Sequence, residues 1–73
     1  MGRMQSRFAN WKDAQASAKE RRGKGVEFKC FELFPLNKDG KAEKQSECYY
    51  IGAEKACDKI AKTGRYKMVP KRI

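Results

Sequence analysis

The sequence predicts an α+β domain with three antiparallel strands in the order β-β-α-β and one helix packed on the sheet. Three observations carry this prediction: alternating apolar residues over 26–34, a turn sequence at 37–41, and a helix-spaced apolar stripe over 53–61. A basic arm, residues 1–25, precedes this unit and is predicted to be helical or partly disordered. The β-β-α-β domain itself is assigned to residues 26–73.

The strongest local prediction is a β-hairpin. Asn37 followed by Asp-Gly is the composition of a type I turn closed by a left-handed glycine, the common three-residue hairpin loop. Pairing Asn37 with Lys41 sets the register of the return strand, residues 43–51. The expected partners are Cys30 with Cys48 and Phe28 with Tyr50.

A helix over residues 53–61 is predicted by apolar side chains that recur at helical spacing: Ala53, Ala56, Cys57, Ile60 and Ala61. Gly64 is placed to end this helix as a left-handed cap. The last strand, residues 65–69, stops at Pro70, which marks a sheet edge. The first strand is apolar on both faces, so we expect it at the centre of the sheet with the last strand antiparallel beside it.

The N-terminal segment has good helix propensity but few apolar residues. Asn10 is suited to cap a helix that continues to Gly23. Apart from Phe8, Trp11 and four alanines, that helix has little to pack against the domain. We therefore expect partial disorder ahead of residue 10 and a frayed helix after it.

The chain of 73 residues is strongly basic, with 18 Lys and Arg against 9 Asp and Glu and a net charge of +9. The surplus lies in residues 1–25 and 53–73, whereas residues 26–52 are nearly neutral. It indicates an acidic partner: a nucleic acid, an anionic membrane or an acidic protein surface. A membrane is disfavoured, because no apolar run approaches the ~20 residues of a spanning helix and no signal peptide is present. We expect a cytoplasmic protein.

The composition argues against an enzyme. The chain has no His and hence no imidazole base or ligand, and we expect no catalytic residue, no metal and no cofactor. The three cysteines do not form a Cys-x-x-Cys pair and read most simply as small core residues.

Two groups of residues are candidates for contact with a partner. The first interleaves aromatic rings with cations and is typical of binding interfaces: Arg7, Phe8, Trp11 and Lys12. Its alternative is that both rings belong to the core and the cations are solvated. The second group is a basic C-terminal set suited to nucleic acid or another acidic surface: Arg65, Lys67, Lys71 and Arg72. Its alternative is a solvated edge strand kept soluble by lysine.

Over its full length the chain resembles small transcription regulators of lytic bacteriophages that bind host RNA polymerase. The resemblance lies in three features: the basic N-terminal stretch with Arg7, Phe8 and Trp11, the hairpin at 37–40, and the Ala-rich helix ending at Gly64. It implies a non-enzymatic protein of the host cytoplasm that binds the N-terminal region of the largest polymerase subunit, near the RNA exit channel. The family also implies antitermination and inhibition of promoter recognition. We further expect a chain that is monomeric when free and that lies close to nascent RNA when bound to the polymerase.

Two other functions stay open. The chain could bind DNA or RNA directly, with the sheet or the basic ends on phosphates, which predicts a steep salt dependence. A structural role in a ribosome or virion predicts co-sedimentation with particles.

Overall fold

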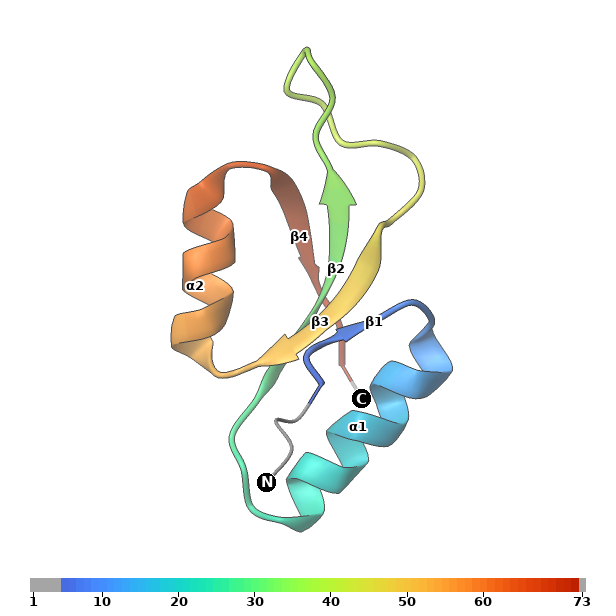
Figure 1. Cartoon of the computed structure of the whole chain (residues 1–73), viewed down its shortest axis with the longest axis vertical. Coiled ribbons are helices and arrows are strands. Elements are labelled where there is room, and N and C mark those ends of the chain that lie inside the picture. The colour runs from blue at the N-terminus through green and yellow to red at the C-terminus, as the bar shows by residue number, and fades with distance from the viewer. Residues whose placement is uncertain (1–4, 73) are drawn as a thin grey trace.

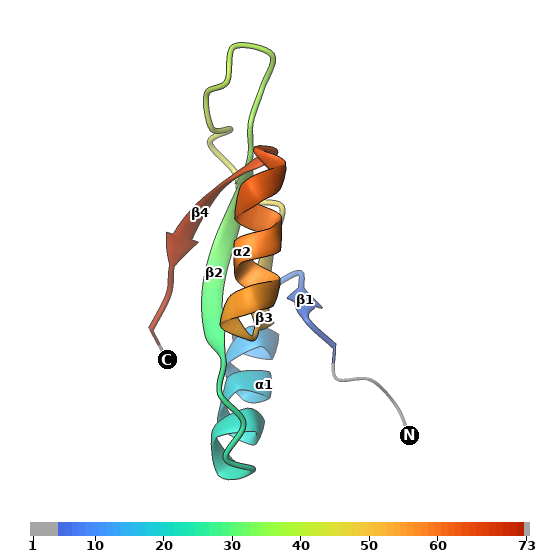
Figure 2. The same cartoon turned by 90° about the vertical axis from the view of Figure 1, so that its left-hand side faces the viewer.

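The computed structural model describes residues 5–72, which form a four-stranded antiparallel sheet with one helix on each face (Figures 1 and 2). The elements are β1 (Arg7–Phe8), α1 (Trp11–Gly23), β2 (Lys29–Pro35), β3 (Cys48–Gly52), α2 (Glu54–Thr63) and β4 (Tyr66–Pro70). The strand order is β1-β3-β2-β4. The predicted α+β class is confirmed, but the sheet has four strands rather than three, because β1 pairs with β3.

β2 is the central strand and β4 is an edge strand, as the sequence predicts. β2 pairs antiparallel with β3 on one side and with β4 on the other. The strand β4 ends at Pro70, whose nitrogen cannot donate a ladder hydrogen bond. The helix α2 ends at Gly64, whose φ of +69° is the predicted left-handed cap.

The hairpin tip has the predicted turn and register. The Asn37 N–H donates to the Lys41 carbonyl at 2.8 Å, and Gly40 has a φ of +76°. The Asn37 side-chain oxygen also accepts from the Asp39 and Lys41 N–H groups, at 2.9 and 3.0 Å. This tip protrudes from the sheet and forms one end of a molecule that measures 41 × 23 × 23 Å (Figure 1).

Below the tip, the strands are paired three residues away from the predicted register. Cys30 lies opposite Ile51, so the predicted partners Cys30 with Cys48 and Phe28 with Tyr50 are wrong. Because side chains alternate along a strand, an odd shift places Cys30 and Cys48 on opposite faces of the sheet. The two thiols therefore do not face each other.

Residues 43–47 cause this shift. The Glu43 N–H donates to the Pro35 carbonyl and the Glu47 N–H to the Leu33 carbonyl, each at 2.8 Å. Between these two bonds the return segment advances four residues, from Glu43 to Glu47, whereas β2 advances only two, from Pro35 to Leu33. The return segment therefore contains extra residues that are not paired in the ladder. Within this loop, the Ser46 side chain hydrogen-bonds the carboxylate of Glu32 in β2.

The sheet buries apolar side chains on both faces. On the α1 side the core consists of Phe8, Ala14, Ala18, Cys30 and Ile51, with Trp11, Phe28 and Tyr49 packed around it. On the α2 side, Leu33, Cys48 and Cys57 are buried. The three cysteines are buried free thiols, which confirms their prediction as core residues.

The predicted helix after Asn10 is confirmed as α1. The Asn10 side-chain oxygen accepts from the Asp13 N–H at 2.9 Å, which satisfies one of the free donors at the helix start. α1 buries Ala14, Ala18 and Arg21 against the sheet. The expected boundary at residue 25 falls in the loop after α1, and elements on both sides of it contribute to the same core.

The expectation of disorder ahead of residue 10 is wrong for residues 5–9. β1 pairs with β3, and the Ser6 carbonyl accepts from the Ile51 N–H at 2.8 Å. Two physical reasons explain this order: Phe8 fills the core on the α1 side, and β1 pairs the edge of β3. The first four residues of the expected disordered segment lie outside the described residues.

Candidate interface for an acidic partner

The N-terminal candidate group does not form one surface. Arg7 and Phe8 are neighbours in β1, so their side chains lie on opposite faces of the sheet. Phe8 is 8% exposed and belongs to the core on the α1 side, opposite Tyr49. Arg7 lies opposite Tyr50 on the α2 side.

Arg7 is held by aromatic and polar neighbours on the α2 side. Its guanidinium lies 5.7 Å from the ring centroid of Tyr50 and 6.0 Å from that of Tyr66. One of its N–H groups donates to the Cys48 sulfur at 3.6 Å, and a Glu47 oxygen lies 4.0 Å away. The Tyr66 side chain also hydrogen-bonds Glu47, and this bond, together with burial, raises the pKa of Tyr66. With 51% of its side chain exposed, Arg7 both tethers β1 and offers charge at the surface.

Trp11 and Lys12 begin α1, on the other face of the sheet. The Trp11 ring packs on Tyr49, with ring centroids 5.2 Å apart and planes tilted by 46°. Trp11 is half-buried against the core, whereas Lys12 is exposed. The structure therefore brings Trp11 next to Phe8 and Tyr49 but separates it from Arg7.

On the α1 side, α1 packs mainly on β1 and β3, so the half of the sheet formed by β2 and β4 is not covered by a helix. The register places four side chains there, which we call the open face: Glu32, Phe34, Lys67 and Val69. Glu32 is paired with Val69 across the strands, and Phe34 with Lys67. Phe34 and Val69 are half-buried and Lys67 is exposed. A ring and a cation thus stand side by side on this surface.

Glu32 neutralises one of the nearby cations. Its carboxylate lies 3.1 Å from the Lys71 ammonium and is only 15% exposed. Hydrogen bonds from Ser46, Lys71 and Tyr49 lower the pKa of Glu32, against the opposing effect of burial. Burial and this carboxylate raise the pKa of Tyr49, which stays a neutral donor. Glu32 therefore remains ionised and holds Lys71 at the edge of the open face.

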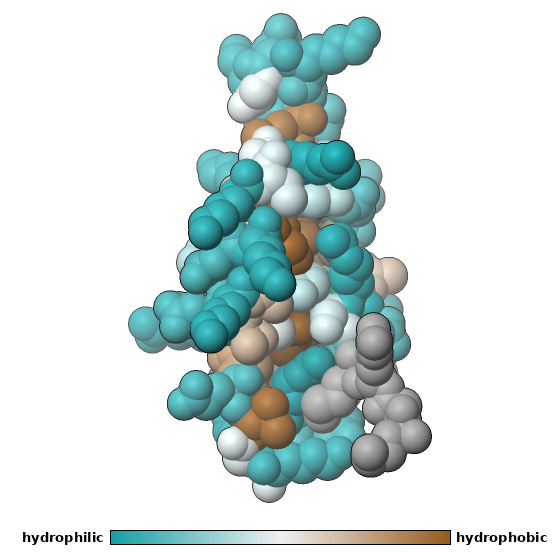
Figure 3. All heavy atoms as spheres, turned by 60° about the vertical axis from the view of Figure 1, so that its left-hand side comes forward, coloured by the Kyte–Doolittle hydropathy of each residue, from teal (hydrophilic) through white to brown (hydrophobic). Residues whose placement is uncertain are grey.

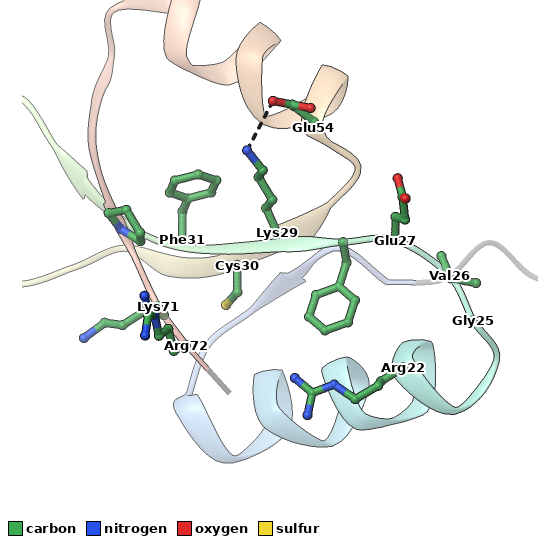
Figure 4. Close-up of a pocket in the computed structure, with 12 residues that line it drawn as sticks. Arg22, Gly25, Val26, Glu27, Lys29, Cys30, Phe31, Glu54, Lys71 and Arg72 are labelled. Atoms are coloured by element: carbon green, nitrogen blue, oxygen red, sulfur yellow. Dashed lines mark hydrogen bonds and ion pairs between the residues drawn. The ribbon is translucent and has the colours of Figure 1, made fainter.

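A groove adjoins the open face where β4 ends and the chain leaves α1 for β2, and its volume of about 860 Å³ is lined from both faces of the sheet. We call it the basic groove; its α1 side is lined by Arg22, Phe28, Cys30, Lys71 and Arg72. In Figure 4, Arg22 extends from α1 on the same side of β2 as Cys30, and Lys71 and Arg72 approach from the C-terminal segment. The backbone places that segment, because the Lys71 N–H donates to the Cys30 carbonyl at 2.9 Å.

The remaining charged residues of this groove belong to its α2 side. Lys29 points to α2 and forms an ion pair with Glu54, at 3.2 Å, and Glu27 also points away from α1 (Figure 4). The charges on the α1 side of the groove are therefore those of Arg22, Lys71 and Arg72.

The structure brings three members of the C-terminal candidate group together. Lys67, Lys71 and Arg72 follow one another along β4 and its extension, whereas exposed Arg65 lies at the opposite end of β4. Sequence reasoning missed Arg22 and Phe28 as members of this surface. Arg22 stood in a mixed-charge stretch typical of a polar helix end, and Phe28 appeared only as a core-facing strand residue, so neither carried a recognisable signal.

The α2 side of the molecule presents a different surface. Figure 3 shows that hydrophilic side chains cover most of this side, with apolar surface confined to narrow bands between them. The exposed lysines of α2, Lys55, Lys59 and Lys62, lie on the outside of a helix rather than beside a groove.

Comparisons with protein-family models, with curated proteins and with solved structures found no match for this chain. In the described part of the chain, no helix is long and apolar enough to cross a bilayer. Residues 5–72 also contain no group of three or more His, Cys, Asp or Glu side chains that could hold a metal ion.

Proposed function

We propose that the chain is a non-catalytic domain that binds single-stranded nucleic acid across the open face and the basic groove. The observation that carries the proposal is the gathering of four cations and two aromatic rings on the α1 side of the sheet. The cations are Arg22, Lys67, Lys71 and Arg72, and the rings are those of Phe28 and Phe34.

Single strands suit this combination, because their phosphates bind cations while their unpaired bases stack on aromatic rings without sequence preference. Lys67 and the Lys71–Arg72 pair lie along an edge strand, so a backbone running parallel to β4 meets one cation after another. The Phe34 ring next to Lys67 offers a stacking surface beside the phosphate path.

Binding to bacterial RNA polymerase is a second candidate, which the family resemblance implies. The observation in its favour is Trp11, a half-buried indole at the surface next to exposed Lys12, since Trp is a common anchor of protein interfaces. In this function the same basic side would dock on an acidic surface of the largest subunit. Antitermination and inhibition of promoter recognition stay predictions of that resemblance.

The test is fluorescence anisotropy of labelled single-stranded RNA and DNA oligonucleotides, titrated with the protein at about 50 to 200 mM salt. Since Lys71 faces Glu32, three cations are left for phosphates, and we expect log Kd to change with log salt with a slope of magnitude about 2. The variant Lys67→Gln is expected to weaken binding and to lower this slope by about 0.7.

The matched control is Lys55→Gln, which removes the same charge from the exposed surface of α2 on the other side of the sheet. It should leave the affinity close to that of the unmodified chain. Equal losses in both variants, or no measurable binding of either oligonucleotide at low salt, would overturn the proposal. Retention of polymerase from a nuclease-treated bacterial lysate, without binding of free oligonucleotides, would instead favour the second candidate.

A further inference from the structure

The strand β4 leaves one backbone edge of the sheet unpaired. Among the described elements, β4 has a neighbouring strand only on the β2 side, and Figure 2 shows no element beyond it. Two hydrogen bonds at the ends of this pairing fix its geometry. The Leu36 N–H donates to the Arg65 carbonyl at 3.0 Å, and the Lys71 N–H donates to the Cys30 carbonyl at 2.9 Å. Arg65 and Lys71 therefore point their backbone groups toward β2.

The backbone groups that point away from the sheet belong to the residues in between. Inward and outward groups alternate along an antiparallel strand, so Lys67 and Val69 also face β2. The N–H and carbonyl groups of Tyr66 and Met68 then point outward. The free edge is short, because the nitrogen of Pro70 has no hydrogen to donate. It suits a short extended segment rather than a long strand.

Two exposed cations at this edge indicate which segment fits it. Arg65 directly precedes β4, and Lys67 lies within it. Within residues 5–72, neither side chain forms an ion pair. In an added antiparallel strand, the residue opposite Lys67 belongs to a non-hydrogen-bonded pair, in which side chains lie closest together. An acidic residue is favoured at that position and a basic residue is disfavoured.

A second copy of the chain does not suit this edge. The twofold register that pairs every N–H and carbonyl of Tyr66 and Met68 places Lys67 opposite Lys67 of the other copy. Each copy also carries a net charge of +9. Lysine and proline on an edge strand prevent this kind of self-pairing, but the same lysine does not oppose an acidic segment.

We propose that the free edge of β4 is a docking site for an extended acidic segment of a partner protein, which adds a strand to the four-stranded sheet. The backbones of Tyr66 and Met68 form the new ladder, and acidic side chains at alternate positions of the segment lie beside Lys67 and Arg65. The other side chains of the segment face the α2 side next to half-buried Tyr66 and Met68, so apolar residues fit there. This site goes beyond the proposed function, because backbone groups of the edge, rather than the open face, hold the ligand.

The first experiment measures amide hydrogen exchange in the full chain, with and without the blocked peptide Thr-Val-Glu-Val-Glu-Val-Thr. Without peptide, the amides of Tyr66 and Met68 should exchange about tenfold or more faster than those of Lys67 and Val69, which face β2. Saturating peptide should slow exchange at Tyr66 and Met68 about tenfold or more, because each N–H gains a hydrogen bond. Protection confined to other residues, or no saturable binding at millimolar peptide, would overturn the proposal.

Two other ligands test the class of partner. The peptide Thr-Val-Lys-Val-Lys-Val-Thr has the same length and apolar pattern but the opposite charge, and we expect it to bind about tenfold more weakly or less. Equal affinity of the two peptides would contradict the choice of an acidic segment. A single-stranded RNA oligonucleotide should leave exchange at Tyr66 and Met68 unchanged. If it slows these two amides as much as the acidic peptide does, the edge belongs to a nucleic-acid interface and the proposal is wrong.

The second experiment uses variants that separate the edge from the open face. Met68→Pro removes an outward N–H and should weaken binding of the acidic peptide about tenfold or more, whereas oligonucleotide binding should not change. Slow exchange at Lys67 and Val69 in this variant confirms that β4 still pairs with β2. Peptide binding by a folded Met68→Pro chain as tight as that of the unmodified chain would rule out the edge.

A charge variant keeps the test decisive even if Met68→Pro does not fold. Lys67→Gln changes an exposed side chain and should weaken binding of the acidic peptide about threefold, because it removes the cation beside the acidic residue. The matched control Lys55→Gln, on the outside of α2, should leave peptide binding unchanged. Equal losses in both variants would show that net charge alone attracts the peptide, and the proposal would fail.

Discussion

The two basic ends of the chain carry similar charge but have different structural roles. In the N-terminal end, three basic and aromatic side chains hold the fold together: Phe8 lies in the core, the Arg7 guanidinium lies near the rings of Tyr50 and Tyr66, and Arg21 is 4% exposed. In the C-terminal end, Lys67 and Arg72 are exposed beside apolar surface. Net charge alone does not separate a structural cation from one available to a partner.

The difference follows from what each segment pairs with. β1 contributes two residues to the sheet and needs side-chain support, which Arg21 provides by donating to the Gln5 carbonyl at 3.0 Å and to the Ser17 hydroxyl. β4 pairs with β2 along five residues, so backbone hydrogen bonds hold this strand in the sheet. Lys71 forms an ion pair with Glu32, whereas Lys67 is exposed at the surface.

Phe8→Ala is the strongest test of the structural role of the N-terminal end. Removing this buried ring should lower the free energy of unfolding by about 3 kcal/mol, through lost burial and a cavity. That is a large share of the roughly 4–11 kcal/mol expected for a domain of this size. Urea denaturation followed by Trp11 fluorescence measures it.

Deleting residues 1–9 should have at least as large an effect, because it removes β1 as a whole. A segment that is disordered ahead of residue 10, as the sequence predicts, could instead be deleted with little loss of stability. A loss below about 0.5 kcal/mol in Phe8→Ala would show that β1 is a dispensable arm.

The neighbouring arginines of α1 provide a matched pair for the same comparison. Arg21→Gln should lower the free energy of unfolding by about 2 kcal/mol, because it breaks the charged hydrogen bond to the Gln5 carbonyl in a buried setting. Arg22→Gln changes an exposed residue and should therefore lower the free energy of unfolding less than Arg21→Gln does, while it should weaken oligonucleotide binding. Urea denaturation and the anisotropy titration on both variants give the result. The reverse pattern would contradict both assignments.

Much of the fold could be predicted because its signals are local. The turn at Asn37, the cap at Gly64, the N-cap at Asn10 and the edge strand ending at Pro70 each depend on a few adjacent residues. The strand register was not predicted, because residues 43–47 leave the ladder and so shift every pair below the hairpin tip, and no local sequence signal marks this loop. β1 was missed for a similar reason, because two residues carry no periodic pattern.

The candidate site was predicted in part. Lys67, Lys71 and Arg72 were found because they are close in sequence and lie on one edge strand. Arg22 and Phe28 join them only through the packing of α1 under the sheet and the position of the C-terminal segment. The N-terminal candidate group does not form a single surface, because successive side chains of a strand point to opposite faces and Arg7 and Phe8 are neighbours in β1.

Replacing Glu32 is expected to have the smallest effect on stability, and it tests how the C-terminal end is held. Its pKa is lowered in the folded chain, so its ionised form contributes stability that is fully present above the ordinary value of 4.5. This contribution is lost as the pH falls from 4.5 through the lower folded value, where the carboxylate is protonated. Glu32→Gln should therefore lose less stability than the unmodified chain between pH 7 and about pH 3, by about 0.5 kcal/mol.

The same variant changes binding in the opposite direction. At pH 7 it removes the carboxylate that faces Lys71, so one more cation is available to phosphates. We expect tighter oligonucleotide binding and a salt slope larger by up to about 0.7. Anisotropy titrations of Glu32→Gln beside Glu54→Gln, which frees Lys29 on the α2 side, measure this difference. An equal gain in affinity in both variants would mean that the loss of any acidic side chain strengthens binding through net charge. The α1 side of the sheet would then not be the interface.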